Sequence, residues 1–314
     1  MKAAIFRVVK PGLQTTVQDL GRQGFQQFGV SPSGAMDSYS MQIANILVGN
    51  TVGKAVLEAS LIGPQLEALS DMTIAVCGGN FSLRVEGHDV PMWRSFLLKQ
   101  GQILSLGTSK QGIRAYLAIS GGIDVPSVLD SKSTFLNGGF GGHEGRALRV
   151  GDILYGDPSL RKPYKLLHSD LIPEYKKQME VRVILGPHQH RFTEQSLRRF
   201  FTEPFIITPQ SNRMGYQLTG PKLEHTEGPD IISDPIPRGG IQVPASGQPI
   251  ILMADRQTTG GYTRIGTVIS SDIPLLAQAI PGTTAKFVET TIQEAQTLYL
   301  KRAILLKHLA LTNK

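Results

Sequence analysis

Cysteine is almost absent from this 314-residue sequence, and long apolar runs are missing altogether. The single cysteine, Cys77, excludes an internal disulfide framework and is typical of a protein in a reducing compartment. No apolar run reaches the roughly 18 residues that span a bilayer. Arg7 and Lys10 interrupt the apolar N-terminus, where a secretory signal needs an unbroken core. We therefore expect a soluble cytoplasmic protein.

Charged residues are also sparse, at 18%, whereas hydrophobic residues make up 40% of the chain. This composition supports a real core and differs from that of disordered chains. The formal net charge is +7, but the basic residues are scattered and the densest groups are pairs such as Arg198-Arg199. No aromatic-interleaved basic stripe accompanies them, so a solvated basic surface is favoured over nucleic-acid binding.

Glycine and proline, by contrast, are abundant, with 34 and 19 residues. They separate short strand-like segments at 4–9, 72–78, 81–87, 102–107, 114–120, 181–186, 205–209 and 249–255. This punctuation favours a mainly β chain, a barrel or sandwich with a few helices, over βαβ repeats. Helices are expected over about 36–48, 193–201, 274–280 and 291–309. Thr291 and Glu294 have the spacing of a capping box at the start of the last one.

An internal echo indicates two halves. LIGPQLE at 61–67 returns as LTGPKLE at 218–224, an offset of 157 residues, which is half of the chain. The polar stretch 156–180 contains three prolines and is the natural linker. We expect an N-terminal strand-rich half over residues 1–165 and a C-terminal strand-rich half over residues 166–314.

Two segments concentrate hydrogen-bonding groups among glycines: TTVQDLGRQGFQQFGVSPSGAMD at 15–37 and MADRQTTGGYTRIGTVI at 253–269. A structural turn rarely needs so many different polar groups, whereas a pocket that orients a small polar molecule does. A third segment, SNRMGYQL at 211–218, adds Asn212 and Arg213, which can offer a fork to a carboxylate or carbamate. Arginines among carboxylates suit a small zwitterionic or amide substrate.

Three glycine- or histidine-containing motifs carry less weight. GNTVGKA at 49–55 lacks the spacing of a phosphate loop, and Gly49 is expected to cap the first helix. NGGFGGHEGR at 137–146 is either a long flexible loop or a lid or anion nest with Arg146 as charge partner. His188 and His190 alternate but have no third ligand, so metal binding is not expected.

Two further residues carry a thiol or a hydroxyl that could act chemically. Cys77 lies in a strand pattern and is expected to be a buried thiol. Ser33 lies just before the first helix, where N-capping and ligand contact are both open.

Together these segments resemble the family of the 5-oxoprolinase C-subunit, also called KipA or allophanate hydrolase subunit 2-like. The family's carboxyltransferase-type domain also occurs within urea carboxylase. The matching segments run in order over nearly the whole chain, at 15–37, 47–50, 116–134, 145–152, 211–221 and 241–269. Two departures stand out: Gln217 replaces a frequent basic residue, and Asp234 stands where Glu is common.

The resemblance implies a cyclophilin-like β-barrel architecture and a partner, the B-subunit or KipI-like protein. With a further A-subunit, this pair is associated with ATP-dependent opening of 5-oxoproline to glutamate, and carboxyltransferase-type relatives move a carboxyl group from carboxybiotin to urea. The sequence has no biotin-attachment motif and no recognisable nucleotide-binding motif. We therefore expect the complex to use ATP, and the sequence does not identify which of its chains binds it. We expect no metal or biotin site in this chain and no nucleic-acid or membrane partner.

The main interpretation is the C-subunit of an ATP-dependent 5-oxoprolinase. The alternatives are a KipA-type regulator that antagonises a KipI-like kinase inhibitor, and a carboxyltransferase acting on urea or a related amide. Asp19 and Asp255 are the candidates for proton transfer. The candidates for substrate binding are polar and mostly charged: Arg22, Ser33, Asn212, Arg213, Arg256, Gln257 and Thr258. Six of these residues are predicted to converge on one cleft, near the surface that receives the B-subunit: Asp19, Arg22, Asn212, Arg213, Asp255 and Arg256.

Overall fold

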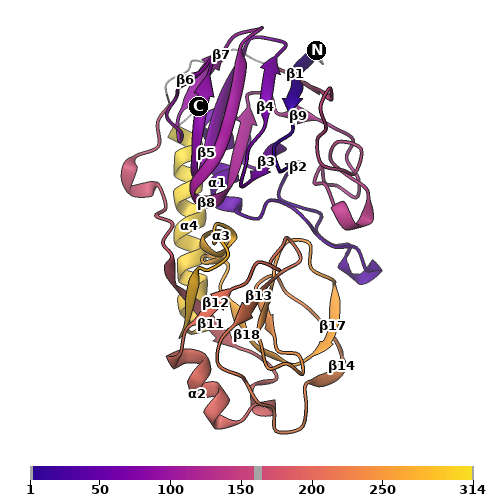
Figure 1. The fold of residues 1–314 in the computed structure, drawn as a ribbon, viewed down its shortest axis with the longest axis vertical. Helices are drawn as coiled ribbons and strands as arrows, with labels where there is room; N and C mark the ends of the chain where they lie inside the picture. Colours follow the sequence, from indigo (N-terminus) through magenta and orange to yellow (C-terminus); the bar gives the residue numbers. More distant parts are fainter. Residues whose placement is uncertain (1–2, 159–164, 313–314) are drawn as a thin grey trace. The chain divides into compact units, whose positions relative to one another are not determined.

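The computed structural model describes residues 3–158 and 165–312, which group into two compact units (Figure 1). The first unit comprises Met1–Arg22, Ser33–Tyr175 and Ile304–Lys314, and the second comprises Gln23–Pro32 and Lys176–Ala303. The first polar string is therefore divided between the two units. One of the points at which the chain passes between the units lies between Tyr175 and Lys176, within the polar stretch 156–180.

The first unit is built on a ten-stranded sheet with the order β2-β3-β8-β4-β1-β10-β9, in which β5 pairs with β6, β7 and β8. The strands are β1 (Ala3–Lys10), β2 (Gln14–Gln18), β3 (Val56–Ser60), β4 (Gln65–Ala68), β5 (Met72–Val85), β6 (His88–Asp89), β7 (Ser95–Leu98), β8 (Ile103–Ile119), β9 (Ile123–Asp124) and β10 (Ile153–Gly156). Side chains alternate between two buried clusters, since Val76 faces one and Cys77 the other. Burial on both faces explains why the central strands read as continuous apolar runs.

Strands β5 and β8 are longer than the sequence pattern indicated. Strand β5 joins the predicted segments 72–78 and 81–87, and β8 joins 102–107 and 114–120. The pairing of β5 with β8 continues through the glycines because its register shifts between Gly78 and Phe81. Gly78 has φ +111°, and a side chain there would overlap the carbonyl of Arg114. Glycine thus marks a bulge here and not a strand end.

Helix α1 (Ser38–Leu47) contacts β5 and β8 and buries Met41, Ile43 and Ile46. Its N-cap is Asp37, whose carboxylate accepts from Ser40 N at 2.9 Å and from Ser40 Oγ at 2.6 Å. N-capping by Ser33 is therefore wrong, because Asp37 occupies that position. Gly49 follows the helix with φ +74°, so its predicted role as the terminating glycine is confirmed.

The second unit contains a closed barrel with the order β11-β18-β15-β16-β13-β12-β19 (Figure 1). Its strands are β11 (Gln178–Leu185), β12 (Phe205–Ile207), β13 (Gly215–Thr219), β15 (Gly240–Gln242), β16 (Ile250–Leu252), β18 (Arg264–Val268) and β19 (Thr284–Glu289), and β14 (Asp230–Pro235) pairs with β17 (Thr259–Tyr262) beside it. Phe200, Phe205 and Phe287 pack together in its core. The predicted mainly β architecture with a closed barrel and few helices is confirmed.

The remaining helices are short except the last. They are α2 (Glu194–Thr202), α3 (Ile273–Ala277), α4 (Ile292–Thr312) and the 3₁₀ turns η1 (Gln26–Phe28), η2 (Leu136–Gly138), η3 (Ser169–Leu171) and η4 (Gln189–Arg191). Glu294 N donates to Thr291 Oγ1 at 3.2 Å and Thr291 N to Glu294 Oε2 at 3.3 Å, so the predicted capping box is confirmed. Within residues 3–158 and 165–312, no helix has both the length and the apolar character of a membrane span.

Candidate functional site

The Asp19 carboxylate is the centre of a hydrogen-bond cluster at the end of β2. Its Oδ1 accepts from Gly21 N at 2.8 Å, Ser131 Oγ at 2.7 Å and Ser133 Oγ at 2.5 Å, and its Oδ2 accepts from Lys132 N at 2.6 Å. The residue is only 9% exposed. A carboxylate offers about four lone-pair sites, so the protein itself occupies most of this capacity. This geometry makes Asp19 a clamp between the turn after β2 and segment 131–133.

Arg22 is fully buried in the first unit. Its Nη2 donates to Ser133 O, its Nε donates to Val128 O at 3.5 Å, and its guanidinium lies 4.9 Å from the centre of the Phe140 ring. A buried cation held by carbonyls and an aromatic face supports the surrounding loops. Arg22 therefore links the turn after β2 to the glycine-rich segment 137–146.

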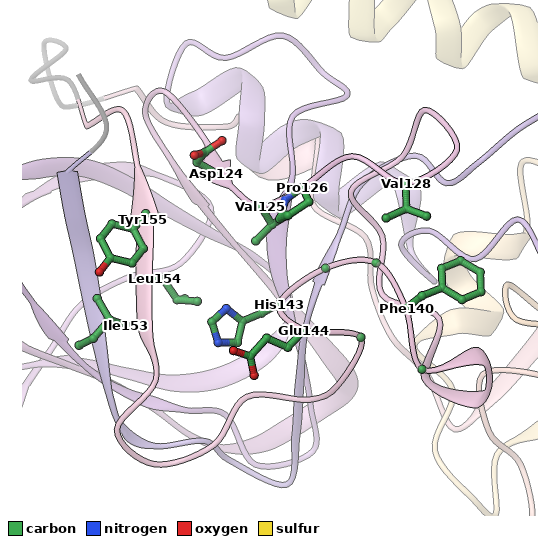
Figure 2. A pocket seen from close by; sticks show the side chains of 14 residues that line it. Asp124, Val125, Pro126, Val128, Phe140, His143, Glu144, Ile153, Leu154 and Tyr155 are labelled. Carbon is green, nitrogen blue, oxygen red and sulfur yellow. The ribbon is translucent and has the colours of Figure 1, made fainter.

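The glycine-rich segment forms the wall of a cavity of about 420 Å³ in the first unit (Figure 2). Its apolar lining includes Val125, Pro126, Val128, Phe140 and Leu154, and its polar lining includes Asp124, His143, Glu144 and Tyr155. His143 Nε2 lies 3.5 Å from Asp152 Oδ2. Arg146 donates to both Asp152 oxygens, at 2.7 and 2.9 Å, and chiefly through these bonds lowers the pKa of Asp152 to about 2. Arg146 thus pairs with Asp152 and Glu144 of its own unit.

In the second unit the NRM and DRQ segments come together. Arg213 donates from Nε to Asp255 Oδ2 at 2.8 Å and from Nη2 to Oδ1 at 3.0 Å, and both side chains are 5% exposed. The backbone N–H of Asp255 also donates to Arg213 O at 2.8 Å. Such a two-point pair fixes the plane of the guanidinium. Asp255 is therefore the orienting partner of Arg213.

Asn212 shapes the turn that leads into β13. Its Oδ1 accepts from Met214 N at 2.8 Å and from Gly215 N at 3.4 Å, which is the usual way an asparagine closes a turn on its own backbone. Because its carbonyl is committed to this turn, the amide NH₂ is the part of Asn212 that a ligand would meet.

Arg256 is a buried cation among neutral acceptors. It is 7% exposed and donates to Ile236 O at 2.9 Å and to Met253 O at 3.3 Å. Burial lowers the pKa of Arg256 to about 10, with a further contribution from the neighbouring cation Arg238. A guanidinium with backbone carbonyls as acceptors and a second cation nearby favours the arrival of an anion.

The next two residues of the DRQTTGGY string are more accessible. Gln257 is exposed and Thr258 is half-buried, and the carbonyl of Thr258 accepts from Ile236 N at 2.9 Å. Their side chains can therefore meet a ligand beside Arg256. Ser31, from the first polar string, donates to Ala254 O at 3.5 Å, so the two strings share a contact within the second unit.

Asp19, Arg22 and Ser33 belong to the first unit, whereas the site residues of segments 212–213 and 255–258 belong to the second. That these residues line one common cleft remains a prediction. Sequence reasoning missed Glu58 and Tyr116, two buried polar residues of β3 and β8 that hold the backbone next to Ser33. The available signal was the single acid of the short strand β3 and the tyrosine two residues after Arg114 in β8, and Arg114 Nε lies 3.8 Å from Glu58 Oε1.

His188 and Cys77 lie within the part of the chain that the structure describes. No group of three or more His, Cys, Asp or Glu side chains there is placed to hold a metal ion. His188 Nδ1 accepts from Arg264 N at 3.1 Å, which gives this histidine a structural bond. Cys77 is buried, and burial raises the pKa of its thiol.

Comparison with known proteins gives a consistent picture. Residues 28–289 match the family model of the carboxyltransferase domain, subdomain A and B. The chain is 39% identical over 291 residues to the 5-oxoprolinase C-subunit of Escherichia coli (strain K12), with 93% of each chain covered. It is 32% identical to urea amidolyase of Saccharomyces cerevisiae, covering 96% of this chain but 17% of that protein. The crystal structure of Kluyveromyces lactis urea carboxylase has a TM-score of 0.93 at 33% identity, covering 98% of this chain and 29% of that one. The chain therefore belongs to the carboxyltransferase domain family, subdomain A and B, and is a relative of the 5-oxoprolinase C-subunit.

Proposed function

We propose that this protein is the C-subunit of a cytoplasmic, ATP-dependent 5-oxoprolinase, in which it binds 5-oxoproline and helps activate the lactam for ring opening to L-glutamate. The identity of 39% with the E. coli C-subunit supports this choice over urea amidolyase, at 32%. The observation that carries it in the structure is Arg256, a buried cation that donates to backbone carbonyls.

The substrate offers two polar groups, a carboxylate and a lactam amide. The carboxylate would pair with Arg256 and offset the burial and the repulsion that lower the pKa of this arginine. Gln257 and Thr258 follow on the same loop, where their donors would polarise the lactam carbonyl. Arg213, with its plane fixed by Asp255, is a second cation of the same unit.

Other subunits of the complex would supply the ATP-dependent activation of the amide. An unstrained amide carbonyl is a poor electrophile, and ATP used by the complex would provide a better leaving group before the ring opens. The GNTVGKA segment does not resemble a phosphate cradle, because Gly49 ends α1 and the Asn50 side chain donates to Asn45 Oδ1 at 2.9 Å and Ile119 O at 2.8 Å. We therefore assign the recognisable ATP site to a partner, either the A-subunit or the KipI-like B-subunit.

The test is reconstitution from three purified subunits. The mixture should form glutamate from 5-oxoproline and ATP, and Arg256→Ala should abolish most turnover while the complex still elutes intact. Arg198→Ala is the matched control, because Arg198 is an exposed arginine of the same unit whose ion pair with Glu194 lies on the surface of α2. A wild-type mixture that forms no glutamate contradicts the function, and unchanged turnover in Arg256→Ala contradicts the site.

Carboxyl transfer to urea or a related amide is the second candidate, favoured by the TM-score of 0.93 with urea carboxylase. It requires a biotinylated partner protein, so activity that survives avidin treatment would exclude it. Complex formation without any turnover would instead favour a KipA-type regulatory role.

A further inference from the structure

The glycine-rich segment that walls the cavity of the first unit has a run of backbone donors without acceptors. Within the described residues, no protein acceptor receives a hydrogen bond from the N–H groups of Gly141, Gly142, His143 or Glu144. Gly141 and Gly142 are themselves buried. Buried N–H groups are almost always paired with protein, water or a ligand, so these four consecutive donors need an acceptor that the surrounding chain does not provide.

The conformation of this segment gathers the four donors. Gly142 and Glu144 have φ +57° and +55°, whereas the φ of His143 between them is negative. Alternation between left- and right-handed residues turns successive N–H groups toward one concave side, an arrangement known as a nest, which attracts anions. The cavity meets the backbone directly at Gly141 and Gly142, because a glycine lines it without a side chain. The nest of residues 141–144 therefore forms part of the cavity wall.

The nest is held in place by its own turn and by the neighbouring segment 131–134. Gly145 N donates to Gly141 O at 2.8 Å, which closes the turn. A side chain on Gly142 would overlap Thr134 Oγ1, so the two segments pack closely at this point. This packing favours a preformed site over the flexible loop or lid that the sequence also allowed.

Two acids line the same cavity, and each has a cation beside it. Asp124 Oδ1 lies 3.7 Å from Lys132 Nζ, and Glu144 Oε2 lies 2.6 Å from Arg146 Nη2. These cations offset the charge with which the two carboxylates would repel an anion. The cavity therefore combines paired acids with unpaired amide donors.

We propose that this cavity binds a small organic carboxylate, with its charged group on the nest of residues 141–144 and an apolar body against Val125 and Leu154 (Figure 2). The volume of about 420 Å³ is within the range of small-molecule sites, which are mostly apolar with a few fixed polar groups. Inorganic phosphate would leave the apolar wall uncovered, whereas a carbon ring would cover it. Every residue of this site belongs to the first unit, so the inference does not depend on the proposed function or on Arg256.

Two probes of similar shape test the proposal: cyclopentanecarboxylate, which is charged, and cyclopentanecarboxamide, which is neutral. In calorimetric titrations of the full chain at neutral pH, we expect the carboxylate to bind at least about tenfold more tightly, because hydrogen bonds to an ionised acceptor are about twice as strong as neutral ones. In NMR spectra recorded with glycine-selective isotope labelling, its addition should shift the amide signals of Gly141 and Gly142. The signals of Gly87 and Gly101, two exposed glycines of the same unit, should stay in place.

Val128→Phe tests the cavity itself. Val128 lines the cavity and is half-buried, so the larger ring should occupy the ligand's space and weaken binding of cyclopentanecarboxylate at least about tenfold. Val150→Phe is the matched control, because Val150 is 70% exposed, belongs to the same unit and does not line this cavity, and it should bind the probe as the wild type does.

Three results would overturn the inference: no binding of the carboxylate, equal affinity for the two probes, or unchanged amide signals of Gly141 and Gly142. Wild-type affinity in Val128→Phe would also contradict it. The comparison of the two probes uses the wild-type chain and therefore decides the question even if Val128→Phe lowers the midpoint of thermal unfolding.

Discussion

Arg213 and Asp255 bind each other through side chains and backbone across 42 residues of sequence. Two nitrogens of the guanidinium meet the two carboxylate oxygens at 2.8 and 3.0 Å, and neither side chain is more than 5% exposed. Desolvation of both charges offsets much of their attraction, so the pair contributes orientation more than stability. It keeps the NRM and DRQTTGGY segments in one fixed arrangement.

Removing one partner of this pair should destabilise the fold strongly. Asp255→Ala removes the carboxylate that binds the buried Arg213 guanidinium at two points, and we expect the free energy of unfolding to fall by about 3–5 kcal/mol in urea titrations. The double variant Arg213→Met/Asp255→Leu removes both charges and should recover most of that loss. A loss of under about 1 kcal/mol in Asp255→Ala would show that water reaches the pair as it does a surface ion pair.

Acid stability should depend on Arg146. Its hydrogen bonds lower the pKa of Asp152 from 3.8 to about 2, so the folded state binds protons less readily than the unfolded chain. The resulting stability is present above about pH 4 and is lost as pH falls toward about 2. Because the pair is partly exposed to solvent, Arg146→Ala should cost about 1 kcal/mol at neutral pH.

The difference between Arg146→Ala and wild type should vanish on acidification. Unfolding measured in steps from neutral to acidic pH gives the comparison. Arg149→Ala is the control, because Arg149 binds Asp152 through its backbone N–H at 2.7 Å, which the substitution keeps. A constant difference at all pH values would mean that Arg146 stabilises the fold by packing and not by its charge.

Local signals in the sequence predicted the elements that depend on neighbouring residues. Thr291 with Glu294 and Gly49 are such cases, since each acts within one helical turn. The predicted strand lengths were wrong because the glycines around Gly78 have the local pattern of a turn. Only their pairing with β8 makes them a bulge. Ser33 and Asp37 are both N-cap types, and the choice of Asp37 depends on the remote Tyr116 hydroxyl that holds its backbone.

The sequence indicated candidate site residues by their type, but it did not indicate their contacts. The polar strings identified Asp19 and Arg213 because unusual groups were concentrated there. Their partners were not accessible to the same reasoning, because Ser131 is 112 residues from Asp19 and Asp255 is 42 residues from Arg213. Such pairs depend on the tertiary fold, which one sequence does not reveal at the level of single atoms.

Cys77 should be inert in the native protein. Burial, and then the negative charge of Asp37, raise the pKa of its thiol well above its ordinary value, so the reactive thiolate is scarce. We expect no reaction with a disulfide reagent at mildly alkaline pH and complete reaction of the single thiol in concentrated guanidinium chloride. Rapid reaction of the native protein would reveal local opening of the sheet beneath α1.

Two glycines of the cavity wall offer a matched comparison. A side chain on Gly141 would overlap the carbonyl of Ser133 and come within 2.8 Å of Arg22 Nη2, whereas Gly139 has open space around it. Both have positive φ, so Gly139→Ala should cost about 1 kcal/mol from backbone strain alone. Gly141→Ala should cost at least about 2 kcal/mol more, because segments 131–133 and 139–145 must move apart. Equal losses in thermal or urea unfolding would contradict the close approach at Arg22.

The variant Asp19→Asn distinguishes two roles of Asp19, a structural clamp and a proton-transfer group. The substitution keeps the shape but replaces one acceptor oxygen by an NH₂, which then faces donors such as Lys132 N or Ser131 Oγ. If Asp19 is a clamp, the free energy of unfolding should fall by about 2–3 kcal/mol, the range for a buried donor left facing another donor. Asp89→Asn, an exposed acid of the same unit, should change it by less than about 0.5 kcal/mol. If Asp19 instead transfers a proton, stability should hold while turnover of the reconstituted complex falls. Its four donors from the turn after β2 and segment 131–133 lead us to expect the first outcome.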